Sequence, residues 1–266
     1  MKAAVSRYEP AQSTEIEWSR LAEELVSFVA PTSPGADQYR TVRHVLERLH
    51  RDSGFQVLAV TSPCPGEGKT LTALNLAGSL AQSPGARVLV IDADLHRPAV
   101  AEYLGLARTR APGLAEAIMT GGYSLAQTVR RLDSLNVSVL VSGVSYAAPY
   151  ELLASPRFEA LLGEARRLYD YVLIDTPPVV PLTDSRLLGR WIDGYLVVVA
   201  AHRTPRRMLT EALNLLDAAK IIGVMFNGDD RPLNSYSGYY AYHPPPPSGS
   251  GKAGWWQRAL KLGRHA

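Results

Sequence analysis

The sequence predicts an α/β fold, with a mostly parallel sheet and helices on both of its faces. Apolar runs of strand length recur along the chain, and segments with helical spacing of apolar residues separate them. Unbroken apolar strands are typical of parallel sheets, because helices bury both faces of such a sheet. The expected strands are 55–61, 87–92, 137–141, 171–175, 195–201 and 221–226, and the expected helices between them are 70–81, 156–168 and 205–220.

Two further helices are expected before the first of these strands. Apolar residues at helical spacing predict a helix over 13–30, which Pro31 and the Pro34-Gly35 pair should end. A second helix is expected over 37–51. We therefore divide the chain into an N-terminal extension (1–36), a central α/β domain that starts with this helix (37–229), and a flexible tail (230–266).

Composition excludes several classes of protein. A formal net charge of +3 over 266 residues gives no strong basic signal, so we expect no nucleic-acid partner. The single cysteine, Cys64, excludes a disulfide framework within the chain and suits a reducing compartment. No apolar run approaches the ~20 residues that cross a bilayer, and no secretory signal is visible at the N-terminus. These features predict a cytoplasmic protein.

The strongest motif lies between the first expected strand and the helix at 70–81. It reads Pro65-Gly66-Glu67-Gly68-Lys69-Thr70, the pattern of a phosphate-binding P-loop. Backbone N–H groups and a helix N-terminus would face the phosphates, Lys69 would add a charge, and Thr70 could bind Mg²⁺. A Gly/Pro-rich turn without function is the weaker interpretation. The nucleotide-binding residues expected here are Gly66, Glu67, Gly68, Lys69, Thr70 and Leu71.

Acidic residues follow two of the apolar strands. Asp92 and Asp94 end one strand and Asp175 ends another. Ligands of open parallel sheets bind beyond the carboxyl ends of the strands, where carboxylates can hold Mg²⁺ or accept a proton. A single Asp here would be read as a helix cap. Three of them beside a P-loop favour a site that binds Mg²⁺ through Thr70, Asp92 and Asp175.

These motifs resemble those of the bacterial tyrosine autokinases of capsule and exopolysaccharide assembly, of the type without a fused membrane activator. The similarity covers the P-loop, the acidic stretch at 91–98, the Walker B-like stretch at 174–178, and Asn227. The resemblance implies that Asn227 faces the adenine ring of ATP. It also implies a catalytic set, namely Lys69, Asp92, Asp94 and Asp175.

The chain departs from the family pattern at several positions. His96 stands where the family has an arginine, with Arg97 beside it, and Ala148 stands where Asn is frequent. A helix motif that packs subunits into rings is matched by Asp37, Arg40 and Arg43, with Asp in place of Glu. A solvated helix face with local ion pairs is the alternative for this triplet. Partitioning ATPases fit less well, because Cys64 replaces their second P-loop lysine.

A tyrosine cluster lies in the tail. About ten residues separate it from the last expected strand, a span of at most ~35 Å. The resemblance implies that the chain phosphorylates this cluster, between subunits of a ring. It also implies a separate transmembrane activator from a polysaccharide export system, peripheral attachment to the inner face of the membrane, and an opposing tyrosine phosphatase. The expected phosphoacceptors are Tyr236, Tyr239, Tyr240 and Tyr242.

Other functions stay open on the sequence alone. The chain could be a non-kinase P-loop ATPase that switches conformation and recruits polysaccharide machinery, with the tail as a binding element. A sticky, unstructured aromatic segment is the weaker interpretation of the tail. Its basic end, over 252–266, could lie on an anionic membrane surface or form a short solvated helix. A scaffold with a degenerate site is disfavoured by the intact Lys69, Thr70, Asp92 and Asp175.

Overall fold

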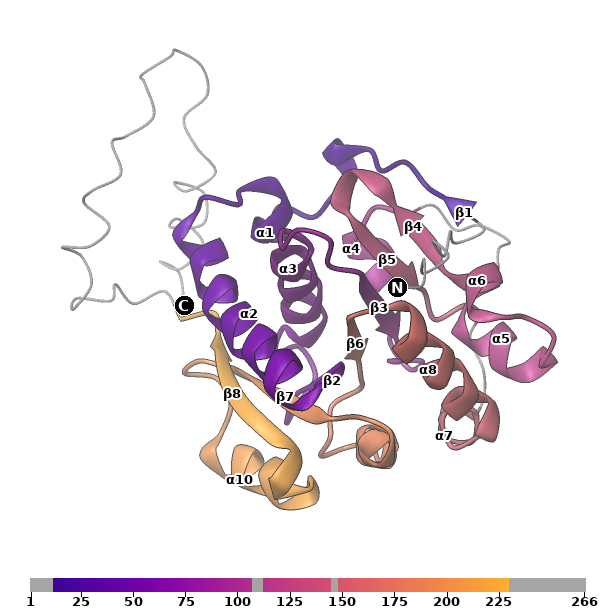
Figure 1. Cartoon of the computed structure of the whole chain (residues 1–266). Helices are drawn as coiled ribbons and strands as arrows, with labels where there is room; N and C mark the ends of the chain where they lie inside the picture. The colour runs from indigo at the N-terminus through magenta and orange to yellow at the C-terminus, as the bar shows by residue number, and fades with distance from the viewer. Residues whose placement is uncertain (1–11, 107–111, 145–147, 230–266) are drawn as a thin grey trace, which may run out of the picture. The chain divides into compact units, whose positions relative to one another are not determined.

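The computed structural model describes residues 12–106, 112–144 and 148–229. These residues form one sheet with strand order β1-β4-β5-β3-β6-β2-β7-β8 (Figure 1). All neighbouring strands are parallel except β4 and β5, which confirms the predicted fold class. The strands are β1 (Gln12–Ser13), β2 (Val57–Thr61), β3 (Val88–Asp92), β4 (Arg130–Leu132), β5 (Val137–Leu140), β6 (Tyr171–Asp175), β7 (Gly194–Ala200) and β8 (Ile221–Asn227).

Helices cover both faces of the sheet, because alternate residues of each buried strand point to opposite sides. In β2, for example, Val57 and Ala59 join one apolar cluster, whereas Leu58 and Val60 join the other. The longer helices are α2 (Pro34–Ser53) and α3 (Lys69–Ala81) on one face, and α8 (Pro156–Leu168) and α10 (Arg206–Leu215) on the other (Figure 1). The shorter ones are α1 (Val26–Val29), α4 (Val100–Tyr103), α5 (Leu114–Thr120), α6 (Leu125–Thr128), α7 (Pro149–Leu153), α9 (Asp184–Leu187), and the 3-10 turns η1 (Trp18–Arg20), η2 (Asp133–Leu135), η3 (Leu188–Arg190) and η4 (Ala218–Lys220).

The predicted helix over 13–30 is wrong. This segment contains β1, the turn η1 and the single helical turn α1. Backbone groups of this segment form hydrogen bonds with the buried side chain of Asn75 in α3. The Asn75 amide accepts from Ser27 N at 2.9 Å and donates to Glu24 O at 3.0 Å. Contacts with the core therefore replace the local helical pattern, as tertiary packing often overrides propensity.

Helix α2 begins earlier than the boundary at 37 that the sequence indicated. Pro34 occupies its first turn, and Ser33 caps it by accepting a hydrogen bond from Ala36 N at 3.2 Å. Proline is favoured at that position, because its missing N–H would have no helical partner there. The Pro34-Gly35 pair thus starts a helix instead of breaking one.

The predicted helix over 205–220 is shorter in the structure. It ends at Leu215, and the turn η4 completes the segment. Strand β4 was not predicted: its three residues include two arginines, so it lacks an apolar pattern.

Candidate active site

The P-loop joins the buried strand β2 to helix α3. Gly66 and Gly68 both have positive φ angles, 76° and 89°, which glycine adopts without strain. A Cβ atom at Gly68 would lie only 1.9 Å from the amide nitrogen of Asn227. That amide nitrogen donates a hydrogen bond to the carbonyl of Glu67 at 3.0 Å. The end of β8 therefore packs directly on the P-loop, and Gly68 is required by both its conformation and this contact.

Glu67 holds the loop in place. Its side chain accepts hydrogen bonds from Cys64 N at 2.9 Å and from the hydroxyl of Thr204, which follows β7. Glu67 is only 4% exposed, so this carboxylate acts within the protein and does not face the solvent. Glu67 can therefore contribute to the predicted nucleotide site only through its backbone N–H, because its side chain is bound within the protein. The sequence offered no signal for Thr204 as its partner.

The two polar residues at the start of α3 each contact an acidic residue at a strand end. Lys69 Nζ lies 2.8 Å from Asp94 Oδ2, and the Thr70 hydroxyl donates to Asp175 Oδ2 at 2.6 Å. Burial opposes the charge of Lys69, but Asp175 and Asp94 outweigh it and raise the pKa of the ammonium. The structure thereby brings together the four residues that the sequence placed at separate strand and helix ends.

Asp92 and Asp175 are aligned partners on the adjacent strands β3 and β6, and both are fully buried. Burial, followed by repulsion from Asp175, raises the pKa of Asp92 well above its ordinary value. Burial likewise raises the pKa of Asp175 to about 7, although Lys69 and Thr70 act against this rise. Two buried negative charges on adjacent strands repel each other, so this pair requires a bound cation or a bound proton.

One oxygen of each carboxylate, Asp92 Oδ1 and Asp175 Oδ1, is buried with no hydrogen-bond partner among the described residues. Carboxylate oxygens and a threonine hydroxyl are ligands that Mg²⁺ prefers. No group of three or more acidic, His or Cys side chains in the described ranges could form a complete metal centre. The residues present therefore fit an ion that takes part of its shell from nucleotide phosphates and water, as Mg²⁺ commonly does.

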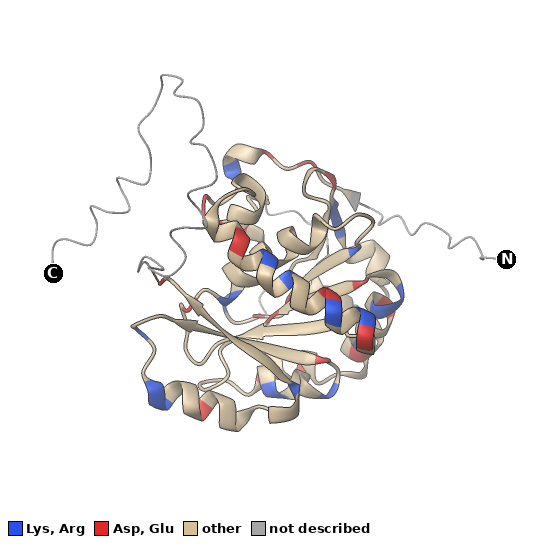
Figure 2. Cartoon of the chain, turned by 60° about the vertical axis from the view of Figure 1, so that its left-hand side comes forward, with Lys and Arg blue, Asp and Glu red and all other residues tan. Residues whose placement is uncertain are grey.

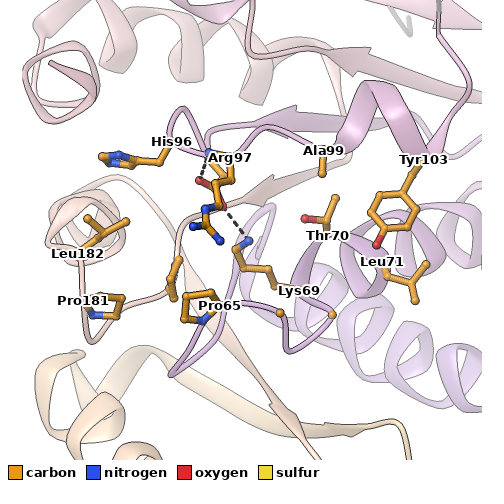
Figure 3. A pocket seen from close by; sticks show the side chains of 14 residues that line it. Pro65, Lys69, Thr70, Leu71, His96, Arg97, Ala99, Tyr103, Pro181 and Leu182 are labelled. Carbon is orange, nitrogen blue, oxygen red and sulfur yellow. Dashed lines mark hydrogen bonds and ion pairs between the residues drawn. The ribbon is translucent and has the colours of Figure 1, made fainter. Parts of the chain in front are cut away.

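A cavity of about 420 Å³ opens above the P-loop (Figure 3). The P-loop and the start of α3 form one wall, and the segments after β3 and β6 form the others. Asp94 reaches this cavity, whereas Asp92 lies behind it in the sheet. The lining residues are Pro65, Gly66, Gly68, Lys69, Thr70, Leu71, Asp94, His96, Arg97, Ala99, Tyr103, Pro178, Pro181 and Leu182.

His96 and Arg97, which stand at the departure from the family pattern, point in different directions. His96 Nε2 lies 2.9 Å from Oδ2 of the buried Asp184 in α9. Figure 3 shows its ring turned away from Lys69, whereas the guanidinium of Arg97 lies toward Lys69. Asp184 was not predicted, because nothing in its local sequence separates it from a helix-starting residue.

The triplet expected at a ring interface lies on α2, away from this cavity. Arg40 pairs with Asp37 and also donates to the carbonyl of Pro31. Arg43 donates to the carbonyl of Ser79 in α3 at 3.0 Å, and its side chain is only 16% exposed. Charged residues of both signs follow one another along α2 (Figure 2). The four tail tyrosines lie outside the described residues.

Comparisons with known proteins identify relatives of this chain. A family model for an AAA domain matches residues 55–213. Tyrosine-protein kinase YwqD of Bacillus subtilis (strain 168) is 35% identical over 224 residues, which are 84% of this chain and 93% of YwqD. The succinoglycan biosynthesis transport protein ExoP of Rhizobium meliloti (strain 1021) is 32% identical over 244 residues, 89% of this chain but 30% of ExoP. The crystal structure of the VpsO kinase domain matches with a TM-score of 0.66 and 33% identity, over 77% of this chain and 95% of that domain.

The fold and the site define a P-loop nucleotide-binding protein with buried carboxylates at the ends of two parallel strands. Within that class, the extensive similarity to YwqD identifies the family. The chain belongs to the bacterial tyrosine-protein kinases, which confirms the family expected from the P-loop and the acidic motifs. The enzyme is therefore a protein-tyrosine kinase that uses a P-loop.

Proposed function

We propose that the chain transfers the γ-phosphoryl group of ATP to Tyr236, Tyr239, Tyr240 and Tyr242 of its own tail, between neighbouring subunits. One observation carries the proposal: Lys69, Thr70 and Asp94 line one P-loop cavity, and Thr70 donates to the buried Asp175 behind it. The tyrosine cluster begins at Tyr236, and β8 ends at Asn227, which packs on that P-loop.

The chain's own residues would bind and orient the reactants. Backbone N–H groups of the P-loop and the Lys69 ammonium would hold the β- and γ-phosphates. Thr70, Asp92 and Asp175 would hold Mg²⁺, which supplies charge neutralisation on the phosphates when bound. Asn227 lies against Gly68 of the P-loop and does not line this cavity, and we assign it to the purine end of the nucleotide.

The transfer step conserves atoms and charge. A bond forms between the phenolic oxygen and the γ-phosphorus, while the bond from that phosphorus to the β–γ bridging oxygen breaks. Its electron pair leaves on ADP. The phenol has an ordinary pKa near ~10, so a carboxylate that takes its proton aids the step. We assign Asp94 as the acceptor of this proton, because Asp94 lines the cavity and Asp92 does not.

The same family membership suggests the cellular setting. We propose a cytoplasmic kinase that regulates exopolysaccharide or capsule polymerisation and export, opposed by a tyrosine phosphatase. The similarity to ExoP, whose name specifies succinoglycan biosynthesis and transport, supports this setting. No helix in the described ranges is long and apolar enough to cross a bilayer. We also propose a separate transmembrane activator, which would hold the kinase at the inner face of the membrane.

Phosphorylation would also act on the assembly. Each phosphate adds roughly −1.5 to −2 charge, so a fully modified cluster carries roughly −6 to −8. A tail with that charge would be repelled from a cavity lined by Asp94, with the buried Asp92 and Asp175 behind it. We propose that this repulsion loosens a ring formed through Asp37, Arg40 and Arg43.

Mass spectrometry of a variant with all four tail tyrosines changed to Phe tests the acceptor site. The purified wild type with Mg·ATP should gain phosphotyrosine within 236–242, and the variant should lose it while still hydrolysing ATP. Phosphotyrosine at the same level elsewhere in the variant would refute the tail as substrate. ATP hydrolysis without any phosphotyrosine in the wild type would favour the alternative, a P-loop ATPase switch that recruits polysaccharide machinery.

A further inference from the structure

Arg97 is a cationic side chain of the active-site cavity that the proposed mechanism leaves unused. It lies in the segment between β3 and α4, it lines the cavity, and it is exposed. Its guanidinium makes no hydrogen bond or ion pair with any described residue. An arginine fork of this kind matches the oxygens of a phosphate, which it can bind through two parallel hydrogen bonds.

The other two basic residues of the cavity already have acidic partners. Lys69 is held by Asp94 at 2.8 Å, and His96 is held by Asp184 at 2.9 Å. An arriving γ-phosphate must therefore share Lys69 with Asp94, whereas Arg97 is available without competition. Figure 3 shows the guanidinium of Arg97 on the side of the cavity where Lys69 lies, which is the lysine paired with Asp94.

The backbone that carries Arg97 is fixed before any ligand binds. Arg97 N donates to Asp94, both to Oδ1 at 3.0 Å and to the carbonyl at 3.2 Å. Asp94 Oδ2 is the atom that holds Lys69, so one carboxylate sets the positions of both cations. Downstream, Val100 N donates to Asp92 Oδ2 at 3.2 Å, which ties the far end of the segment to β3. Pro98 further restricts the backbone of Arg97 to extended conformations.

We propose that Arg97 is a catalytic residue that binds the γ-phosphoryl group and stabilises its charge in the transition state. This inference rests on the proposed phosphoryl transfer, in which the β–γ bond breaks toward ADP while the acceptor oxygen bonds to phosphorus. Charge then develops on the phosphoryl oxygens and on the bridging oxygen, between the P-loop and Arg97. Preorganised cations at such a position commonly accelerate phosphoryl transfer strongly.

The test compares the affinity of the full-length protein for Mg·ADP with its affinity for Mg·ADP plus aluminium fluoride, a mimic of the transferred phosphoryl group. Arg97→Gln should weaken binding of the fluoride complex about 100-fold, with Mg·ADP affinity within about 3-fold of wild type. Arg97→Lys should recover part of this loss, since it keeps the charge without the fork. Arg186→Gln, which removes an exposed arginine of α9 that does not line the cavity, is the matched control and should behave as wild type.

Two results would overturn the proposal. Either Arg97→Gln binds the fluoride complex as tightly as wild type, or it loses Mg·ADP and the fluoride complex to the same extent. These binding measurements need no tyrosine acceptor. A wild type that binds the fluoride complex through Arg97 but forms no phosphotyrosine would therefore refute the proposed acceptor and leave the role of Arg97 intact.

Discussion

At the scale of single residues, the main unfavourable electrostatic interaction is the repulsion between the carboxylates of Asp92 and Asp175. Both carboxylates are fully buried and lie opposite each other on adjacent strands. Each keeps one oxygen without a partner among the described residues. A protein that existed only to be stable would replace such a pair, because buried like charges are costly. The Mg²⁺ ion that we propose to bind with the nucleotide would account for their presence.

The raised pKa values make stability depend on pH in a defined direction. The pKa of Asp175 is about 7 in the folded chain and 3.8 for the free side chain, so the folded state binds the proton more tightly. The stability that this group contributes is fully present below pH 3.8 and is lost as the pH rises through about 7. Asp175→Asn should therefore stabilise the metal-free protein at pH 8, by on the order of 2 kcal/mol, and much less at pH 5. Thermal unfolding at both pH values measures this difference.

Asp193→Asn is a control for which the expected change in stability at pH 8 has the opposite sign. Burial acts against its charge, but hydrogen bonds from Arg166 and the β2 backbone hold the pKa of Asp193 below its ordinary value. Its removal should destabilise the protein at pH 8. If Asp175→Asn destabilised the metal-free protein at pH 8 as Asp193→Asn does, the account of Asp175 as a strained metal ligand would be contradicted.

The sequence located the main residues of the cavity but not their partners. Lys69, Thr70 and Asp175 could be predicted, because the P-loop and the strand ends are local patterns. The contacts of Asn227 with the P-loop, of Thr204 with Glu67, and of Asp184 with His96 could not. These pairs are more than 85 residues apart, and only the order of strands in the sheet brings them together.

At the scale of elements, helix α2 combines a structural and a proposed interface role. Arg43 points to α3, where it bonds the carbonyl of Ser79 and pairs with Glu47 at 3.4 Å. Arg40 instead lies nearer the solvent, with its partners Asp37 and Pro31 on the same stretch of chain. The two arginines of the proposed ring motif are therefore not equivalent within one subunit.

Alanine substitutions should separate these roles. Arg43→Ala should lower the unfolding free energy of the subunit by about 1–2 kcal/mol, because it removes the charge-assisted hydrogen bond from a largely buried side chain to the carbonyl of Ser79. Arg40→Ala should change stability by less than about 0.5 kcal/mol, since surface ion pairs contribute little, yet it should reduce the size of the assembly. Chemical denaturation and light scattering measure the two effects. Equal loss of stability in both variants, with unchanged assembly, would contradict this division.

The elements that the sequence misassigned share a cause. The segment over 13–30 has helical spacing, but its backbone groups bond to Asn75 and its start pairs with β4. Both partners, Asn75 and β4, lie far from this segment in the sequence, so no local pattern indicates them. Strands β2, β3 and β6, in contrast, are buried on both faces and read as continuous apolar runs. Local patterns thus predict the centre of the sheet better than its margin.

At the scale of the whole molecule, the central question is whether transfer occurs between subunits. A mixture of two forms that cannot modify their own tails addresses it directly: Lys69→Ala with an intact tail, and a catalytically intact chain with all four tail tyrosines changed to Phe. We expect the mixture to gain phosphotyrosine on the Lys69→Ala chain, read by mass spectrometry. Each form alone should remain unmodified. A mixture without phosphotyrosine, beside a wild type that modifies itself, would show transfer within one subunit.

The most direct test of the central claim is the phosphotyrosine content of Lys69→Ala after incubation with Mg·ATP, beside wild type. The Lys69 ammonium contacts Asp94 at the phosphate site, so its removal should abolish tail phosphotyrosine while the chain remains folded. Lys2→Ala, a change far from the P-loop in sequence, should retain it. Loss in Lys69→Ala alone is the result we predict. Phosphotyrosine at the wild-type level in Lys69→Ala would contradict the assignment of this cavity as the kinase active site.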